Sequence, residues 1–363
     1  MMNFINRQNK YVVYTIGAIF LLVLPLVLQQ GGNAWVRIAD AALLYVLLAL
    51  GLNIVVGYAG LLDLGFVAFY AIGAYMFGLL ASPHLTDSFA WIAAAFPAGL
   101  HMPLWIVVPA GAALAGIFGI LLGAPTLKLR GDYLAIVTLG FGEIIRVFLN
   151  NLDHPVNITN GPKGLNQIDS FHFWGLNLGR PLHVFGFEIA SVSLYYYLFL
   201  ALVLVSIVIC HRLEVSRIGR AWMAIREDEI AAKAMGINTR NMKLLAFGMG
   251  ATFGGVSGSM FAAFQGFVSP ESFSLMESIM IVAMVVLGGI GHLPGVILGA
   301  VLLSALPEVL RYVAGPLQSM TDGRLDSAIL RQLLIALAMI VVMLWRPHGL
   351  WPAPEHGKSL QAK

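Results

Sequence analysis

The sequence is poor in charge and nearly free of cysteine. Of its 363 residues only 11% are charged and 59% are hydrophobic, whereas about 25% of residues are charged in a typical soluble domain. So apolar a chain has too few polar side chains to cover a water-soluble fold, and its formal net charge is only +3. These figures exclude a disordered protein, a nucleic-acid binder and an ordinary soluble enzyme. The single cysteine, Cys210, excludes an intrachain disulfide and a cysteine-based metal site.

Motifs of catalysis and cofactor binding are also missing. A phosphate-binding loop of the form GxxxxGK[ST] does not occur. Gly357-Lys358-Ser359 has the right ending, but Pro352 stands where the first glycine belongs. There is no HExxH motif, and no Ser/His/Asp set stands in a recognisable local context. We therefore expect no catalytic, metal-binding or cofactor-binding residue in this chain.

Long hydrophobic runs dominate what the sequence does contain. A bilayer-spanning helix needs about 20 mostly apolar residues. The stretch Ser278–Leu310 is too long for one span and is interrupted by Gly288–Gly295, so we divide it into two short spans. The other candidate spans are Tyr11–Leu28, Ala39–Val56, Leu61–Ala81, Pro103–Gly123, Tyr133–Leu149, Ser191–Cys210, Leu244–Phe264 and Ile329–Trp345. The sequence thus predicts an all-α polytopic membrane protein with about ten transmembrane helices. An eight-span version, with 278–310 as a re-entrant hairpin, stays open.

Lysine and arginine between the spans predict the orientation, because cytoplasmic loops are enriched in both. With the N-terminus in the cytoplasm, fourteen of these residues fall in inner segments and five in outer ones. Seven of the fourteen lie in one inner loop, 211–243. An even number of spans and two cytoplasmic termini follow. We divide the chain into an N-terminal segment with the first span (1–37), a membrane domain (38–350) and a polar tail (351–363).

The inner loop 211–243 predicts a docking element rather than a flexible linker. Good helix formers fill Ala221–Met235, and Gly236 stands where a helix C-cap glycine belongs. The acidic run 227–229 is placed to stabilise the first turn of a helix over 229–235. On the other side of the membrane, the loop of about 150–190 is also long enough to carry a function.

Charges and glycine breaks within the apolar runs are candidates for a translocation path or gate. Glu143 and Arg146 share a helix face, so they form an ion pair or line a path. Asp63 either caps nearby backbone, which is a structural role, or belongs to a translocation path or gate. The breaks Gly57–Gly65 and Gly288–Gly295 are either tight turns or places where freed backbone groups line a cavity. The full candidate set is Asn53, Gly57, Gly60, Asp63, Glu143, Arg146, Gly288 and Gly291.

Several of these segments resemble the inner-membrane permeases of branched-chain amino acid ABC importers, in particular the LivM type. The matching stretches are GLNIVVGYAGLLDLG at 51–65, RGDYLAIVTL at 130–139 followed by GEIIR at 142–146, and RPHGL at 346–350. The inner-loop stretch REDEIAAKAMGI at 226–237 resembles the EAAxxxG coupling element of bacterial ABC permeases. An isoleucine between Glu229 and Ala231 departs from the short pattern, in a form similar to this subfamily's own version.

The resemblance implies a machine of five parts in the bacterial inner membrane. Two cytoplasmic ATPase subunits supply the energy, a second, paralogous permease of the LivH type completes the path, and a periplasmic solute-binding protein delivers the solute. Glu229, Ala231, Ala232 and Gly236 are then the residues that couple this chain to an ATPase, and the outer loop 150–190 is the landing surface for the binding protein. The lipid bilayer is a further partner, and nucleic acid is not.

Two other functions stay open from the sequence alone. Permeases of urea or short-amide ABC importers look alike, since selectivity resides mostly in the binding protein. A stand-alone secondary transporter or facilitator belongs to a different class, and it has no need of a coupling element. The expected role is therefore a permease subunit that is not itself an enzyme.

Overall fold

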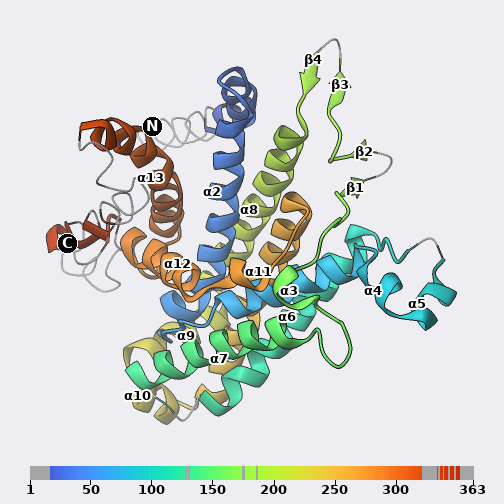
Figure 1. Cartoon of the computed structure of the whole chain (residues 1–363). Coiled ribbons are helices and arrows are strands. Elements are labelled where there is room, and N and C mark those ends of the chain that lie inside the picture. The colour runs from blue at the N-terminus through green and yellow to red at the C-terminus, as the bar shows by residue number, and fades with distance from the viewer. Residues whose placement is uncertain are drawn as a thin grey trace, which may run out of the picture.

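The computed structural model describes residues 17–97, 99–126, 129, 131–173, 176–184, 187–320, 333, 336–337, 339–341, 344–346 and 349–351. Helices make up most of this part of the chain (Figure 1). The long helices are α2 (Asn33–Asn53), α3 (Val67–Leu80), α6 (Leu104–Thr126), α7 (Asp132–Asn151), α8 (Ser191–Val215), α9 (Arg217–Glu227), α11 (Thr239–Gln265), α12 (Leu275–Gly288) and α13 (Leu293–Met320). The short ones are the π-helical turn η1 (Ile54–Tyr58), α4 (His84–Ser88), α5 (Ala90–Ala95), η2 (Gly161–Lys163), α10 (Glu229–Ala234) and η3 (Pro270–Phe273).

Six helices of the described chain are long and apolar enough to cross a membrane. They are Asn33–Tyr58, Leu104–Thr126, Ser191–Val215, Thr239–Gln265, Pro270–Gly288 and Leu293–Leu310. Two shorter apolar helices lie at Gly17–Gln30 and Val67–Leu80. The predicted division of 278–310 is present, because α12 ends at Gly288 and α13 begins at Leu293. About half of the predicted span Ile329–Trp345, and all of the tail 351–363 except Trp351, lie outside the described part of the chain.

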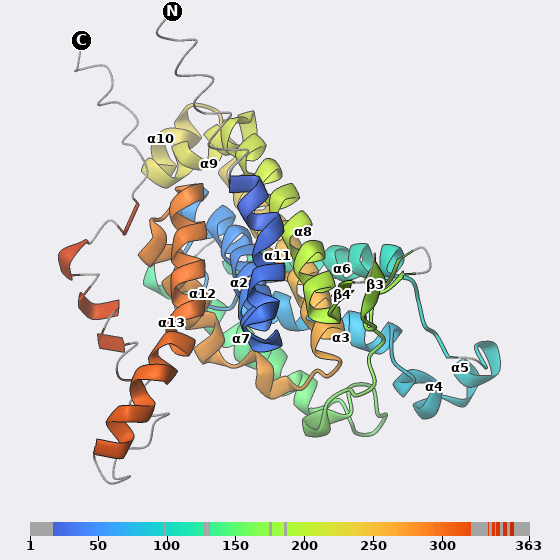
Figure 2. The ribbon, with the colours of Figure 1, turned by 90° about the horizontal axis from the view of Figure 1, so that it is seen from above.

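Helix α11 occupies the centre of the bundle and packs against α2, α3 and α6 (Figure 2). Glycines allow this close approach, because a Cβ on Gly73 of α3 would overlap the carbonyl oxygen of Gly255 in α11. The hydroxyl of Ser259 donates to the carbonyl of Gly73 at 3.2 Å, which joins the same two helices. Helices in a membrane gain little from hydrophobic burial against one another, so this small-residue packing is what holds them together.

The structure differs from the prediction in the third span and in the loop 150–190. The third span was predicted over Leu61–Ala81, but its helix covers only Val67–Leu80, and residues 59–66 have irregular backbone. Gly60 has a φ of +69°, which favours glycine and stops the preceding helix. The all-α prediction also missed two small antiparallel hairpins in the loop 150–190, β1 (His172–Phe173) with β2 (Leu176–Asn177) and β3 (Leu182–Val184) with β4 (Phe187–Ile189).

Close packing at Gly73 generates a stability prediction. We expect Gly73→Ala to lower the free energy of unfolding by about 1–3 kcal/mol, because the added methyl group meets backbone that cannot rotate away. Gly140→Ala in α7 is the matched control, since a Cβ there meets no atom within 4 Å. Thermal unfolding of the purified chain in detergent measures both variants. Equal unfolding temperatures for Gly73→Ala and Gly140→Ala would contradict the packing argument.

Candidate functional site

The two glycine breaks, far apart in the sequence, meet at one end of the bundle. Helix α2 passes into the π-helical turn η1, and the backbone N–H of Gly291 donates to Oδ1 of Asn53 at 3.0 Å. A Cβ on Gly57 would lie 2.9 Å from the nitrogen of Gly291. Gly291 itself has a φ of +82°, so a side chain at this position would strain the backbone. We call Asn53, Gly57, Gly60 and Gly291 the glycine junction.

An arginine of α9 reaches into this junction. Nη1 of Arg226 donates to the carbonyl oxygen of Gly57 at 2.6 Å. A Cβ on Gly60 would lie 2.8 Å from the Cγ atom of Arg226, and one on Gly291 would lie 2.7 Å from its Nη1 atom. The absence of side chains at Gly60 and Gly291 therefore makes room for the arginine. Sequence reasoning missed this role, because Arg226 looked like one of the seven cations of an inner loop that orient the chain.

Helix α9 is firmly anchored next to the junction. Ser216 caps its first turn by accepting from the N–H of Gly219 at 3.1 Å. The fully buried indole of Trp222 donates to the carbonyl of Met242 at the start of α11, at 2.7 Å. Helix α9, which carries Arg226, is therefore joined directly to the central helix α11.

The predicted helix after the acidic run is α10, one residue shorter than expected. Asp228 is its N-cap, and its Oδ1 accepts from the N–H of Ile230 at 2.8 Å and of Ala231 at 3.1 Å. Gly236 follows the helix with a φ of +85°, as a C-cap glycine does. Ala232 is buried, so the side of α10 that faces the protein needs a small residue.

Helix α10 is tied to α11 by an ion pair and leaves apolar side chains exposed. The Nζ atom of Lys243 lies 2.8 Å from a carboxylate oxygen of Glu229. The side chain of Lys243 is only 7% exposed, and a buried ammonium needs such a counter-charge. On the side of the same segment that points away from the protein, Ile230 is 70% exposed and Met235 is 83% exposed. Helix α10 and the turn after it therefore present two large apolar side chains on their exposed side.

Asp63 and Gly288 lie beside the junction and hold backbone in place. Oδ1 of Asp63 accepts from the N–H of Gly65 at 2.9 Å, which is a local turn of the irregular segment 59–66. Within the same segment, the N–H of Leu64 donates to the hydroxyl of Thr138 in α7 at 3.0 Å. A Cβ on Gly288 would overlap the carbonyl of Gly295, so this glycine lets α12 and α13 come together.

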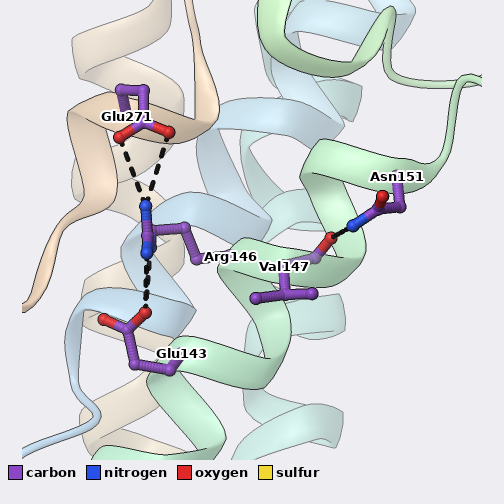
Figure 3. Close-up of polar contacts among 5 residues, drawn as sticks. All are labelled: Glu143, Arg146, Val147, Asn151 and Glu271. Carbon is purple, nitrogen blue, oxygen red and sulfur yellow. Dashed lines mark hydrogen bonds and ion pairs between the residues drawn. The ribbon is translucent and has the colours of Figure 1, made fainter.

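Glu143 and Arg146 do not belong to the junction. Figure 3 shows Arg146 of α7 between two carboxylates, Glu143 on its own helix and Glu271 in η3. The nitrogen–oxygen distances are 2.9 Å to Glu143 and 3.2 Å to Glu271. The cluster lies about 21 Å along α7 from Asp132, at the end of the bundle away from the junction. The pair is present as one of the two alternatives predicted, and Glu271 is a third member that spacing along one helix does not reveal.

A bundle of apolar helices that encloses irregular, glycine-rich backbone defines a polytopic membrane transport protein. Residues 35–343 match the family described as "Branched-chain amino acid transport system / permease component", and the chain belongs to this family. It is 41% identical to the high-affinity branched-chain amino acid transport system permease protein LivM of Escherichia coli K12 over 329 residues, which are 87% of this chain and 70% of the relative. No solved structure matches the chain.

Other relatives include both types of permease. LivM of Salmonella typhimurium LT2 is 40% identical over 354 residues, covering 93% of this chain and 75% of the relative. LivH of Escherichia coli K12 is 25% identical over 316 residues, covering 86% and 92%. The resemblance found in the sequence is confirmed, and the chain is a multi-pass permease subunit of the inner membrane.

The contact between Arg226 and Gly57 generates a test of the junction. We expect Arg226→Gln to speed amide exchange in peptides that cover 57–62 and 288–293 about tenfold, because a charge-assisted hydrogen bond to backbone is lost. Arg217→Gln, at the exposed start of the same helix, is the matched control. Hydrogen exchange of the purified chain, followed by mass spectrometry, gives both rates. If the two variants exchange alike, Arg226 does not hold the junction.

Proposed function

We propose that this chain is the membrane-spanning permease subunit of an ATP-driven importer of branched-chain amino acids. The observation that carries the proposal is the 41% identity, over most of the chain, to a permease named for the transport of these solutes. Partner subunits hydrolyse the ATP. The chain spans the membrane about ten times with both termini in the cytoplasm, so that α9 and α10 lie on the cytoplasmic side. Its membrane domain extends over 38–350.

The segment α9–α10 is the docking site for an ATPase subunit in this proposal. Glu229, Ala231, Ala232 and Gly236 shape the segment, and the exposed side chains of Ile230 and Met235 make the apolar part of the contact. Burial of two such side chains is worth about 1.5–3 kcal/mol each. That is enough to anchor a short helix in a groove.

Arg226 carries the movement of the docked segment to the glycine junction. When an ATPase shifts α9, the guanidinium either keeps or releases the carbonyl of Gly57, and the packing of Gly57 against Gly291 changes with it. The junction is therefore the cytoplasmic gate. Glu143, Arg146 and Asp63 hold the surrounding helices and the irregular segment in position.

The remaining partners follow from the family. The chain is 25% identical to LivH of Escherichia coli K12 over 86% of this chain and 92% of LivH. This similarity supports pairing with a paralogous permease of similar fold, since two similar subunits form a near-symmetric interface. The outer loop 150–190, with its two hairpins, is the landing surface for a periplasmic binding protein. A urea or short-amide importer is the alternative within ABC importers, and a stand-alone facilitator is the alternative outside them.

Solute uptake tests the function directly. We expect vesicles that contain this chain, its paralogous permease, two ATPase subunits and the binding protein to take up leucine only with ATP, because the chain has no phosphate-binding loop. Urea serves as the competing solute. Uptake of urea but not leucine would favour the short-amide importer. Saturable leucine uptake at the full rate by this chain alone, without ATP, would favour the facilitator.

Gly236 tests the docking segment. We expect Gly236→Val to cost about 1–2 kcal/mol locally, since a β-branched residue resists a positive φ, and to reduce both co-purification of the ATPases and solute-stimulated ATP hydrolysis. A Cβ at this position meets no atom within 4 Å, so the backbone alone is tested. Gly236→Asn is the matched control, because asparagine tolerates this conformation. Normal assembly and hydrolysis in Gly236→Val would remove the coupling role.

A further inference from the structure

A small apolar pocket lies between α6, α8 and the loop 150–190. Its volume is about 280 Å³. Figures 1 and 2 both place the hairpins of this loop at the end of α8 that is away from α9. Three separate elements form the walls that matter here, and the residues are Leu104 of α6, Leu178 and Leu182 of the loop, and Leu194, Tyr197 and Leu198 of α8. We call these six residues the leucine pocket.

Hydrogen bonds hold the loop over the leucine pocket. The hydroxyl of Ser191, at the start of α8, donates to the carbonyl of Leu178 at 2.5 Å. The hydroxyl of Tyr195 accepts from the N–H of Phe171 at 3.3 Å, and the carbonyl of Phe171 accepts from the N–H of Leu178 at 2.9 Å. Phe171 is itself buried in the core of the bundle. The pocket is therefore a preformed part of the fold, with its roof joined to α8.

The α8 wall of the pocket continues an exposed apolar face of that helix. Leu194 and Leu198 are about one turn apart, and Val205 and Val208 lie on the same side about two and three turns beyond Leu198. Both valines are 56% exposed. Helix α8 is long and apolar enough to cross a membrane, and lipid tails are as apolar as a leucine side chain. A face of this kind suits contact with lipid tails, and it leads directly into the pocket.

Helix α6 and two aromatic residues place the pocket near the boundary of the bilayer. Leu104 is the first residue of α6, and the neighbouring Trp105 and Ile106 are more than half exposed. The hydroxyl of Tyr197 donates to the carbonyl of Leu22 at 2.9 Å. Tryptophan and tyrosine are enriched where lipid tails meet head groups. The leucine pocket therefore lies at the depth where an acyl chain approaches its head group.

A polar cavity adjoins the pocket on the side of α3. Its volume is about 420 Å³, and it shares Leu104, Phe171 and His172 with the lining of the pocket. The imidazole of His101 and the carboxylate of Asp169 line it and contact each other. An apolar pocket beside a larger polar cavity matches the two ends of a phospholipid.

We propose that the leucine pocket binds an acyl chain of a membrane phospholipid, whose head group lies at the polar cavity. Apolar cavities stay free of ordered water and take up apolar groups. The chain gives the leucine side chains contacts that an empty cavity lacks, and it thereby holds the loop 150–190 against α6 and α8. This lipid site goes beyond the proposed function, since it does not depend on which solute is carried.

A photoreactive group inside the pocket identifies the occupant. Leu182→Cys introduces one reactive thiol, because the natural Cys210 is buried. The thiol is labelled with benzophenone maleimide in membrane vesicles that contain the whole importer, and after irradiation mass spectrometry gives the mass of the adduct. We expect the mass of a phospholipid.

Glu188→Cys is the matched control for this labelling. Glu188 pairs with His183 in the same hairpin, so its side chain lies on the opposite face of the hairpin from that of Leu182. We expect little phospholipid adduct there. An adduct of Leu182→Cys with another polypeptide or with a free fatty acid would overturn the proposal. So would equal phospholipid labelling at the two positions, because it would show general contact with the bilayer.

Retention of lipid in detergent tests the pocket itself. We expect Leu198→Trp, which fills the pocket, to lower the phospholipid that stays bound to the purified importer about fivefold, as native mass spectrometry measures it. Leu204→Trp, at an exposed position of the same helix, is the matched control. Leu182→Ser changes the pocket from the hairpin side without altering a spanning helix, and thermal unfolding reports whether each variant is folded. Folded pocket variants that retain as much phospholipid as Leu204→Trp would refute the site.

Discussion

Backbone that leaves the helical conformation among apolar helices must find its hydrogen-bond partners inside the protein, because lipid has none to offer. The segments 59–66 and 289–292 meet this constraint through side chains of other elements. Thr138 accepts from the N–H of Leu64, and Ser278 donates to its carbonyl at 2.5 Å. Irregular backbone held in this way is stable only while α7 and α12 stay packed against it. The conformation of this irregular backbone and the packing of the bundle therefore depend on each other.

Small residues make that packing possible and determine which helix is central. The close approach of α3 to α11 at Gly73 and Gly255 leaves no room for a methyl group. Because α11 begins just after α10 and packs against α2, α3 and α6, it is the element against which α9 is anchored through Trp222. Helix α9 is thus fixed at two points, to α11 through Trp222 and to the glycine junction through Arg226.

Local patterns in the sequence predicted local structure, and they did not predict which distant elements meet. Hydrophobic runs and the glycine-rich interruption predicted the division between α12 and α13, and the position of Gly236 predicted the end of α10. The third helix is shorter than its apolar run because hydropathy does not register that Gly60 turns the chain. The bond from Gly291 to Asn53 joins residues 238 apart, and that from Arg226 to Gly57 joins residues 169 apart. Neither contact can be inferred from a periodic pattern in the sequence.

Two arginines of the bundle contact different kinds of group, and each kind of contact suits a different structural role. Arg146 lies between the carboxylates of Glu143 and Glu271 (Figure 3), and a charge paired twice resists separation because each ion pair must be broken. Arg226 instead donates to the neutral carbonyl of Gly57. Separating a cation from a carbonyl leaves no opposite charge behind, and the partly exposed guanidinium is hydrated once it is released. The first contact suits a fixed joint between α7 and η3. The second suits a contact that can be released and formed again at little electrostatic cost.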